Sequence, residues 1–437
     1  MVQYSSKRNM KAARTLPLAI GSGGSVPVTL CQSCGNSKLS SILFLGFLPP
    51  VNKLHQIGST PQEQPSYPAE LLYCNQCHLV QLGLIVDPNI IFPPEYPYTS
   101  GTTKVLRDNF ADLYRESRKL LRLKRDDLIV DIGSNDGTLL ENFKLNHRVL
   151  GVTPETIGNI AIKNGIPTMI NYFTKPVVKE IVKKNGKARL ITAANVFAHM
   201  EDIHTVLEAV TLLLQKDGVF ISESHHLLPL IKKVQYDTIY HEHMRYYSLA
   251  SLQNLLKTHG FEIFHAKEIP SHGGSIRVYA AKKGVYPISP SVKKQLQKEK
   301  AITTNKKAFQ EFAKKTVLSK LALHNLMLPI KKAQKRIYGI SAPSRASTLI
   351  NYTGLDAGII DCVLEIKGSY KIGNYIPGTI IPIIDEEKLF KDQPEYALLL
   401  SWHIADELMP KLKKKGFKGD FIVPLPYPKI IKNRTVA

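Results

Sequence analysis

The 437-residue sequence has no hydrophobic run long enough to cross a membrane, and it has few cysteines for its length. No apolar stretch approaches the roughly 18 to 20 residues that a membrane helix needs, which excludes an integral helical membrane protein. Five cysteines are too few for a disulfide scaffold and favour a reducing compartment, so we expect a cytoplasmic protein. Hydrophobic residues make up 43% and charged residues 22%, values that exclude a disordered chain. This length predicts two or three domains.

Acidic residues are also scarce, 36 against 58 Lys and Arg, for a net charge of +22. Such a charge makes nucleic acid, a membrane surface or a phosphorylated ligand natural partners. Between Lys293 and Arg336 there are 13 basic residues and two acids, and the apolar residues there recur with a helical period. One apolar helix face is expected from Phe309, Phe312, Ala313, Val317 and Leu321. Because a solvated basic helix face explains this charge, it does not by itself indicate a nucleic-acid partner.

The first 28 residues contain no acid and four basic residues. They lack the continuous apolar core of a secretory signal, and their acid-poor, Ser-bearing composition is compatible with an organellar transit peptide. A basic, disordered extension over residues 1–28 is the simpler interpretation.

Three further regions differ in their residue pattern. Residues 29–100 are rich in Cys, Pro and Gly, which predicts a small metal-binding module. Residues 101–285 alternate short β-like runs with amphipathic stretches, as in a parallel α/β sheet. Residues 286–437 begin with a basic helical connector (286–335) and then repeat the α/β alternation on a smaller scale. The predicted fold class is therefore α/β, with two Rossmann-like parts behind an N-terminal module.

Two CxxC pairs supply four thiolates, at Cys31 and Cys34 and at Cys74 and Cys77. Each tight turn lets both sulfurs reach one metal, and four thiolates satisfy tetrahedral Zn²⁺. Two separate redox motifs, or chance packing of apolar cysteines, are the alternatives. With four protein ligands the site is closed, so we expect structural rather than catalytic zinc. Cys362 lies alone in a β-like run and is expected to be a buried core thiol.

A buried strand, a glycine turn and a helix start follow one another around Asp131, Gly133, Asn135, Gly137 and Thr138. Gly133 allows close backbone approach to a ligand, and Gly137 opens the following helix. The loop lacks the third glycine of the dinucleotide fingerprint G-x-G-x-x-G. Its polar residues suit the amino-acid end of S-adenosylmethionine better than a pyrophosphate, although another nucleotide remains an alternative. The pattern resembles motif I of class I methyltransferases.

Motif I predicts further cofactor contacts downstream. The strand over residues 147–152 should end on an acid that binds the ribose hydroxyls, but that position holds Thr153, and Glu155 follows two residues later. Either residue could bind the ribose. Phe173 is expected beside the adenine, and Asn195 ends the fourth strand at the cofactor.

The densest group of titratable side chains is the run from Asp237 to Ser248, which contains Tyr240, His241, Glu242 and His243. A core helix has no use for two imidazoles, a carboxylate and three phenols so close together. The histidines are two residues apart, which disfavours a zincin-like metal site. Acid–base chemistry fits better, with His243 as a general base, Glu242 orienting it or sharing the proton, and Tyr240 donating to a developing oxyanion.

Taken together, these motifs resemble the sugar 3-C-methyltransferases of deoxysugar biosynthesis, which methylate the carbon next to the ketone of a nucleotide-linked 4-keto-deoxyhexose. The resemblance covers nearly the whole chain beyond residue 29. The segments that carry it are the four-Cys head, 95–100, the motif I loop, 195–199, 240–243, 272–278, 352–354 and 375–379. One departure is Glu365-Ile366-Lys367-Gly368, where an acidic or Asn-Pro segment is expected.

The resemblance implies an N-terminal zinc module, a central class I methyltransferase domain that binds S-adenosylmethionine, and a C-terminal Rossmann-like domain. It implies that His243 removes a proton beside the ketone with the help of Glu242, and that Tyr240 and Tyr98 lie near the enolate. The nucleophilic carbon then attacks the sulfonium methyl, and positioning supplies most of the acceleration. Tyr96, His199 and His241 are the expected sugar contacts. A monomer or a homodimer is compatible with the sequence.

Two turns, one rich in glycine and one between a strand and a helix start, are candidates for binding the nucleoside diphosphate. One contains His272, Gly274 and Ser275 and leads to Arg277, and the other leads to Ser344 and Arg345. Arginine and backbone amides at helix starts recognise phosphates well. The alternative is that the glycines form a hairpin and that Arg345 is a surface residue.

Two other functions remain open at this point. An RNA or protein methyltransferase would use the zinc head and the basic helix as a binding surface, which accounts for the charge but not for the run from Tyr240 to His243. A non-catalytic binding protein on a methyltransferase scaffold would not need that run at all.

Overall fold

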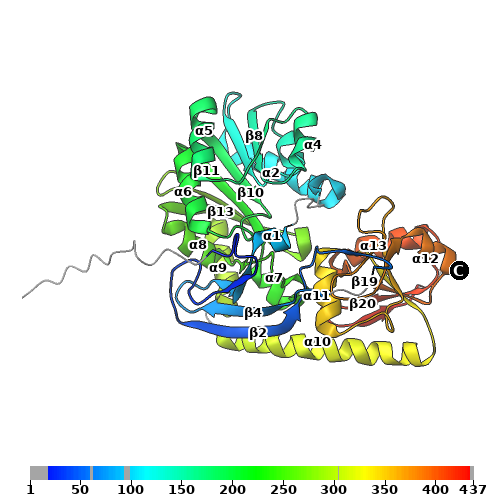
Figure 1. Cartoon of the computed structure of the whole chain (residues 1–437). Helices are drawn as coiled ribbons and strands as arrows, with labels where there is room; N and C mark the ends of the chain where they lie inside the picture. The colour runs from blue at the N-terminus through cyan, green and yellow to red at the C-terminus, as the bar shows by residue number, and fades with distance from the viewer. Residues whose placement is uncertain (1–17, 60–62, 93–98, 304, 434–437) are drawn as a thin grey trace, which may run out of the picture.

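The computed structural model describes residues 18–59, 63–92, 99–303 and 305–433. These residues form three connected parts, namely an N-terminal head, a central α/β part and a C-terminal α/β part (Figure 1). Tyr96 and Tyr98 lie outside the described residues.

The head is built from antiparallel sheets that strands from the other two parts complete. Its four-stranded sheet has the order β12-β5-β4-β2, with β2 (Leu39–Leu48), β4 (Tyr67–Cys74), β5 (Val80–Leu82) and β12 (Arg245–Tyr246). Two small ladders pair β1 (Ser25–Pro27) with β6 (Leu84–Val86) and β3 (His55–Gln56) with β17 (Asn374–Tyr375). Because β12 follows the Tyr240-to-His243 run and β17 belongs to the C-terminal part, the head is joined to both.

The central part is organised around a seven-stranded sheet. Its order is β13-β14-β11-β10-β7-β8-β9, and only β14 runs antiparallel to its neighbours. The strands are β7 (Leu128–Ile132), β8 (Arg148–Thr153), β9 (Thr168–Ile170), β10 (Ala188–Ala194), β11 (Leu214–His225), β13 (Phe261–Ile269) and β14 (Ser275–Lys282). Numbered along the chain, this is the order 3-2-1-4-5-7-6.

Both faces of this sheet are buried, as its apolar strands predict. Side chains alternate along β7, so that Val130 belongs to one hydrophobic cluster and Ile129 to another on the opposite face. The helices and 3-10 turns of this part are α1 (Pro88–Ile91), η1 (Ser100–Thr102), α2 (Lys104–Leu121), α3 (Thr138–Glu141), α4 (Gly158–Lys163), α5 (Lys175–Asn185), α6 (Ile203–Leu213), α7 (Leu227–Lys232), η2 (Tyr236–Thr238), α8 (Leu249–Lys257) and η3 (Ser271–Gly273).

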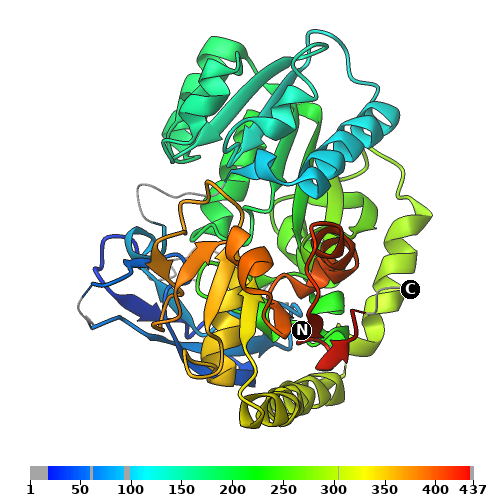
Figure 2. The ribbon, with the colours of Figure 1, turned by 90° about the vertical axis from the view of Figure 1, so that its right-hand side faces the viewer.

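Two helices connect the central and C-terminal parts, α9 (Pro290–Thr303) and α10 (Lys306–Lys332). In both views α10 runs along the base of the molecule, below β2 (Figures 1 and 2). Phe309 and Phe312 lie on its buried face, as the sequence predicts, but Val317 and Leu321 are 49% and 54% exposed. The prediction of one shared apolar face was wrong for these two residues, because polar residues such as Thr316 and Ser319 lie on the buried side.

The C-terminal part has a six-stranded sheet of order β18-β16-β15-β19-β20-β21, parallel except for β21. Its elements are β15 (Ile337–Ile340), α11 (Ser344–Thr353), β16 (Cys362–Glu365), β18 (Ile383–Asp385), α12 (Glu387–Asp392), β19 (Tyr396–Leu399), η4 (Trp402–Ile404), α13 (Ala405–Lys414), β20 (Asp420–Val423) and β21 (Lys429–Ile431). Numbered along the chain, without the short β17, this is the Rossmann order 3-2-1-4-5-6. Cys362 is buried in β16.

One hydrophobic cluster joins the head, α7, η2, α10 and the C-terminal sheet, with members such as Leu71, Leu227, Tyr236, Phe309 and Ile337. A second cluster joins the cysteines of the head to the central sheet. The three parts therefore share cores. Among the described helices, none combines the length and hydrophobicity that a bilayer crossing requires.

Candidate functional site

The predicted cofactor loop lies between β7 and α3, beside the end of β10. Gly133 and Gly137 both have positive φ, as does Asn135. A Cβ on Gly133 would lie 2.7 Å from Val196, and one on Gly137 would lie 2.7 Å from Ile166. The loop is therefore packed closely against Val196 and Ile166, and a side chain at either glycine would collide with one of them.

Asp131 ends β7 inside the sheet, where its carboxylate accepts a hydrogen bond from Thr192 of β10 at 2.6 Å. Burial raises the pKa of Asp131 to about 7, and the Thr192 hydrogen bond opposes that change. Asn195 follows β10 with positive φ, and its backbone amide donates to Glu223 of β11 at 2.7 Å. Three adjacent strand ends thus converge at the point where the strand order reverses, the usual ligand position of an open α/β sheet.

The chain before α2 rests on this loop. The Ser100 amide donates to Asn135 Oδ1 at 2.9 Å, and the Gly101 amide donates to Asp136 Oδ2 at 2.8 Å. The other oxygen of Asp136 accepts from the amide and hydroxyl of Thr138. Asp136 is thus an organising residue of the loop that sequence reasoning did not single out.

The two ribose candidates lie against each other. Thr153 is buried at the end of β8, and its hydroxyl donates to Glu155. Thr153 and Glu155 therefore lie together at the end of β8, and the structure does not favour one of them over the other. Phe173, expected beside the adenine, packs in the core of the sheet, whereas Tyr172 is 53% exposed. Burial and the nearby Glu155 raise the pKa of Tyr172.

His243 is held by a backbone carbonyl. Its Nδ1 lies 2.8 Å from the Thr238 oxygen, and because a carbonyl can only accept, Nδ1 carries the hydrogen and a neutral ring leaves Nε2 as the acceptor. Burial lowers the pKa of His243 to about 4, so the ring is neutral at pH 7. The Tyr240 ring lies 4.1 Å from the His243 ring, and burial raises the pKa of Tyr240 well above its ordinary value. A neutral base and a protonated phenol are therefore side by side.

Other imidazoles surround His243. His199 lies 4.9 Å and His225 6.5 Å from it, ring centre to ring centre. His272 of η3 and His403 of η4 interact electrostatically with this group, and burial lowers the pKa of His272 to about 4 and of His403 to about 2. Sequence reasoning missed His225, which is the last residue of β11, and His403, which lies in η4 after β19.

Glu242 was predicted to orient His243 or to share its proton, but the acceptor at His243 Nδ1 is the Thr238 carbonyl. Instead, Glu242 Oε1 accepts a hydrogen bond from Asn52 of the head at 2.6 Å. The Asn52 side-chain oxygen in turn accepts from Ser344 at the start of α11, at 3.2 Å. Glu242 therefore lies where all three parts of the molecule meet.

His241 is directed away from the other imidazoles. Its Nε2 lies 3.2 Å from the Pro68 carbonyl, and its ring contacts Tyr67, both of β4. Nε2 of His241 therefore faces the head, because residues 240–243 form a turn closed by the hydrogen bond from the His243 amide to the Tyr240 carbonyl, and the substrate contact of His241 stays a prediction.

Arg277 was predicted to bind phosphate, and the structure corrects this. Its side chain is fully buried, and Nε donates to Glu223 at 3.0 Å. Nη1 donates to Asp112 and Glu116, and Nη2 donates to Asn109. This network joins β14 and β11 to α2 and leaves no guanidinium nitrogen for a ligand.

The turn before Arg277 is also an internal contact. A Cβ on Gly274 would lie 2.7 Å from Pro229 of α7, and the Ser275 hydroxyl donates to Ser271. Gln235 donates to the Gly273 carbonyl at 2.9 Å. The predicted substrate contacts of Gly274 and Ser275 were therefore wrong, because the turn is closed by α7 and Gln235.

Arg345 was predicted to bind phosphate or to lie on the surface; it is buried, and two of its three guanidinium nitrogens are bound within the protein. Its Nε and Nη2 form a bidentate pair with Asp237, at 2.7 and 2.8 Å. The Trp402 indole donates to the same carboxylate at 2.7 Å, and the guanidinium lies 5.1 Å from the Trp402 ring centre. The pair is buried.

The loop after β15 is braced by two charged residues that sequence reasoning did not assign. The Ala342 carbonyl accepts from Lys371 Nζ, and the Ala342 amide donates to Glu365 at the end of β16, both at 2.6 Å. Burial lowers the pKa of Lys371, while Glu365 and Glu242 oppose that change. Lys371 therefore lies at the edge of the C-terminal sheet where such folds bind ligands.

The four predicted metal ligands meet in the head. The sulfurs of Cys31, Cys34, Cys74 and Cys77 all lie within 4.8 Å of one another. Cys31 and Cys77 are 3.4 Å apart, and Cys34 and Cys74 are 3.5 Å apart. Hydrogen bonding, first of all from Cys31, lowers the pKa of Cys74. This donor set fits tetrahedral zinc, and no second group of three or more such ligands occurs in the part of the chain that the structure describes.

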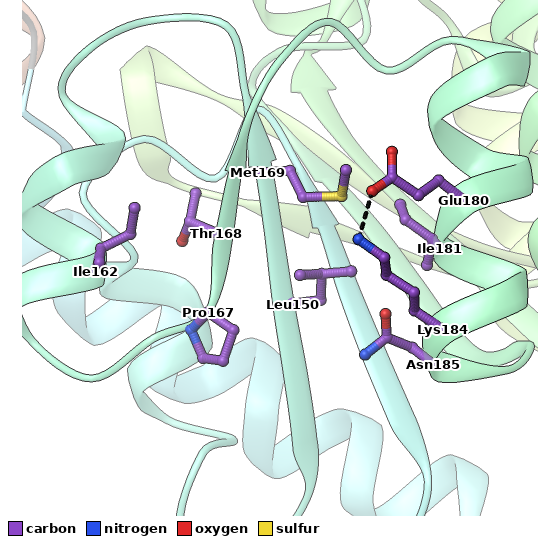
Figure 3. Close-up of a pocket in the computed structure, with 9 residues that line it drawn as sticks. All are labelled: Leu150, Ile162, Pro167, Thr168, Met169, Glu180, Ile181, Lys184 and Asn185. Atoms are coloured by element: carbon purple, nitrogen blue, oxygen red, sulfur yellow. Dashed lines mark hydrogen bonds and ion pairs between the residues drawn. The ribbon is translucent and has the colours of Figure 1, made fainter.

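One cavity of the described structure lies away from these residues. It has a volume of about 390 Å³ and lies between α5 and the β8–β9 edge, lined by Leu150, Met169 and Ile181, with the Glu180–Lys184 ion pair at its side (Figure 3). None of its lining residues is a predicted site residue.

Comparison with known proteins matches the three parts in order. The models are a domain whose description proposes zinc binding (residues 31–92), a methyltransferase domain (105–266) and a C-methyltransferase C-terminal domain (270–426). Over 410 residues the chain is 32% identical to C-methyltransferase NovU of Streptomyces niveus, covering 93% of this chain and 97% of that protein.

Solved structures align only with part of the chain. The PH0226 protein of Pyrococcus horikoshii OT3 is 13% identical, with a TM-score of 0.35, over 43% of this chain and 95% of its own. Magnesium protoporphyrin IX methyltransferase ChlM of Synechocystis PCC 6803 with bound SAM is 14% identical, with a TM-score of 0.30, over 40% of this chain and 78% of its own.

Proposed function

Because this chain belongs to the S-adenosylmethionine-dependent C-methyltransferases, the family of NovU, we propose that it methylates a sugar carbon next to a ketone. The substrate is a nucleotide-linked 4-keto-deoxysugar, and carbon 3 is methylated through an enolate. The observation that carries this proposal is the His243–Tyr240 pair, a neutral base whose Nδ1 is fixed by Thr238 beside a protonated phenol.

His243 is the general base of the proposed reaction. Its Nε2 takes the proton beside the ketone, and Tyr240 donates a hydrogen bond to the oxygen on which negative charge develops. A base whose pKa is about 4 is weak; burial is the main cause of that low value, and the electrostatic interaction with Arg345 contributes to it. A diphosphate bound nearby would offset this positive potential and raise the pKa of His243 towards that of an effective base.

S-adenosylmethionine supplies an electrophilic methyl group on a sulfonium ion. Residues of the β7–α3 loop, Gly133 and Asn135 among them, would hold its methionine part, and Asn195 closes the site from the next strand end. Thr153 and Glu155, already hydrogen-bonded to each other, would hold the ribose. The positive φ of Gly133 and its contact with Val196 support close approach of a ligand to this loop.

The nucleotide end of the substrate needs cationic or amide donors; the guanidinium nitrogens of Arg277 are all bonded within the protein, and two of the three of Arg345 are bonded to Asp237. Lys371 and the start of α11 lie where the strand order of the C-terminal sheet reverses, the position at which such folds bind nucleotides. Lys371 therefore replaces the two arginines as the proposed diphosphate contact.

Exchange of the substrate proton with solvent tests the base directly. Thymidine, cytidine and guanosine diphosphate-linked 4-keto-deoxyhexoses would be incubated with enzyme in D2O, without the methyl donor, and deuterium incorporation followed by mass. His243→Asn should slow exchange at least about 100-fold, the usual contribution of a general base.

His147→Asn is the matched control, since His147 is also buried and its Nδ1 lies 2.8 Å from the carbonyl of Lys124, outside the proposed site. This variant should retain the exchange rate of the wild type. Undiminished exchange in His243→Asn would remove His243 as the base.

A further inference from the structure

The 3-10 turn η2 touches both the proposed base and the C-terminal part. The carbonyl of Thr238, its last residue, accepts from His243 Nδ1 at 2.8 Å and from the Tyr246 hydroxyl at 3.3 Å. The side chain of Asp237, one residue earlier, is fully buried and points to the C-terminal part. One short turn therefore carries two contacts with different partners.

The contacts of Asp237 come from two separate elements of the C-terminal part. Arg345 lies in the first turn of α11 and binds both carboxylate oxygens, while Trp402 lies in η4, after β19, and donates its indole hydrogen to one of them. Tyr236, the first residue of η2, packs edge-to-face on Tyr352 of α11 at 4.9 Å. Strand ends on both sides of the C-terminal crevice thus meet at one carboxylate.

We propose that the C-terminal domain orients the catalytic histidine through this contact, with Asp237, Arg345 and Trp402 as positioning residues. The inference rests on the proposed function, because it takes His243 as the base. Arg345 and Trp402 fix Asp237, Asp237 fixes the η2 turn, and the Thr238 carbonyl of that turn fixes the ring of His243 with Nε2 available. The C-terminal domain then contributes to proton abstraction as well as to substrate binding.

The charges predict a signature that structural damage would not produce. Around His243 lie His199, His225, His272, Tyr240, Tyr246 and Arg345, with His403 beyond His225 and His272. Arg345 lowers the pKa of His243, and Asp237 balances its charge. Without the Asp237 carboxylate the charge of Arg345 is no longer balanced, so the pKa of His243 should fall further. Without the Arg345 guanidinium that charge is absent, so the pKa of His243 should rise.

The exchange rate should fall at low pH, where His243 becomes protonated, and this part of the pH–rate profile is its acidic limb. Asp237→Asn and Arg345→Gln should therefore move the acidic limb in opposite directions. The readout is the pH dependence of deuterium incorporation into the same nucleotide-linked keto-sugars in D2O. The limb should shift to lower pH in Asp237→Asn and to higher pH in Arg345→Gln. Each shift should reach about half a pH unit, below the one to three units of a charge in direct contact. Trp402→Phe, which alters no charge, should slow exchange without moving the limb.

Thr348→Val is the matched control. Thr348 lies one turn after Arg345 on the buried face of α11, and its hydroxyl donates to the Ile239 carbonyl next to η2 at 3.4 Å. This variant disturbs the same contact without altering charge, so the limb should stay in place. Shifts of the same sign in Asp237→Asn and Arg345→Gln, or no shift in either, would overturn the proposal.

A second readout separates this inference from the proposed function. In protein labelled with [15N]histidine, His243 is assigned by the signal that His243→Asn loses, and its titration is followed in each variant without substrate. If the wild type exchanges no proton on any keto-sugar, the proposed function fails, yet opposite titration shifts of His243 would still support the positioning contact. Coincident titration curves would overturn the positioning contact even if the wild type is active.

Discussion

After its first strand, the central sheet continues into a loop with two glycines of positive φ, whereas the C-terminal sheet continues into Ser341, Ala342 and Pro343. Both sheets reverse their strand order at this point, so topology alone predicts a ligand position in each. In the first sheet the two glycines pack closely against Val196 and Ile166. In the second, Lys371 and Glu365 hold the backbone of Ala342 from both sides. The reversal of strand order therefore predicts one ligand position in each sheet, but the loop residues decide what each position can bind.

The two buried arginines show the same contrast. Arg277 joins elements of the central part only, whereas Arg345 joins the C-terminal part to η2. Because the first network supports a fold and the second supports a contact between parts, they should respond differently to substitution.

Metal removal should have the largest effect, and it should act on the central part first. The zinc-ligating cysteines belong to the hydrophobic cluster of the central sheet, and the C-terminal sheet contributes nothing to that cluster. Structural zinc is worth on the order of 10 kcal/mol of folding free energy in small domains. Calorimetry with and without a chelator should show a large loss of thermal stability, with zinc release measured by a chromophoric indicator.

Cys362→Ala is the control for metal removal, because this buried thiol lies in β16 of the other sheet. It should leave zinc content unchanged. If the protein keeps its full thermal stability after zinc loss, the cysteine cluster does not support the hydrophobic core that it shares with the central sheet.

Arg277→Gln should destabilise the protein by about 3–5 kcal/mol, because it leaves Glu223 buried without its cation. Folded enzyme should keep the wild-type Michaelis constants for both substrates, since the network reaches no ligand. Urea denaturation and steady-state kinetics measure the two effects. Lys267→Gln, which removes a half-exposed partner of Asp112, should cost less than about 1 kcal/mol. A Michaelis constant for the nucleotide sugar that rises in Arg277→Gln alone would restore the original phosphate assignment.

Gly133→Ala should weaken S-adenosylmethionine binding by at least about 30-fold, or about 2 kcal/mol, since the new Cβ would collide with Val196 and the backbone has positive φ. Gly165→Ala has a similar φ but no atom within 4 Å of its Cβ, so it carries the backbone strain without the collision. Calorimetric titration of the cofactor should separate the two. Equal losses of affinity in the two variants would contradict the close contact of Gly133 with Val196 as the cause.

The smallest predicted effect concerns acid stability and His403. Burial lowers its pKa to about 2, so between pH 6.5 and that value only the unfolded chain binds this proton. Folding stability must therefore decrease as the pH falls below 6.5, and between pH 6.5 and 5.5 this residue accounts for at most about 1.4 kcal/mol. His403→Gln should flatten the pH dependence of the unfolding free energy by that amount. Parallel curves for variant and wild type would show that His403 is not held neutral.

The order of the parts and the location of the cofactor loop could be predicted because local patterns encode them. Alternating apolar runs predict the buried strands, and the CxxC spacing predicts the cysteine cluster. The roles of Arg277 and Arg345 could not be predicted, because their partners lie far away in the sequence: Asp237 is 108 residues from Arg345, and Glu223 is 54 from Arg277. His225 could have been found by asking which polar residues end strands next to Asn195.

Tracing a labelled methyl group tests the central claim most directly. Enzyme would be given S-adenosylmethionine with an isotopically labelled methyl group, together with the pool of nucleotide-linked 4-keto-deoxysugars and total RNA, and the label located by mass. The account predicts label on the sugar carbon next to the ketone. Label in RNA, with none on a sugar carbon, would contradict it and would make the basic face of α10 a binding surface.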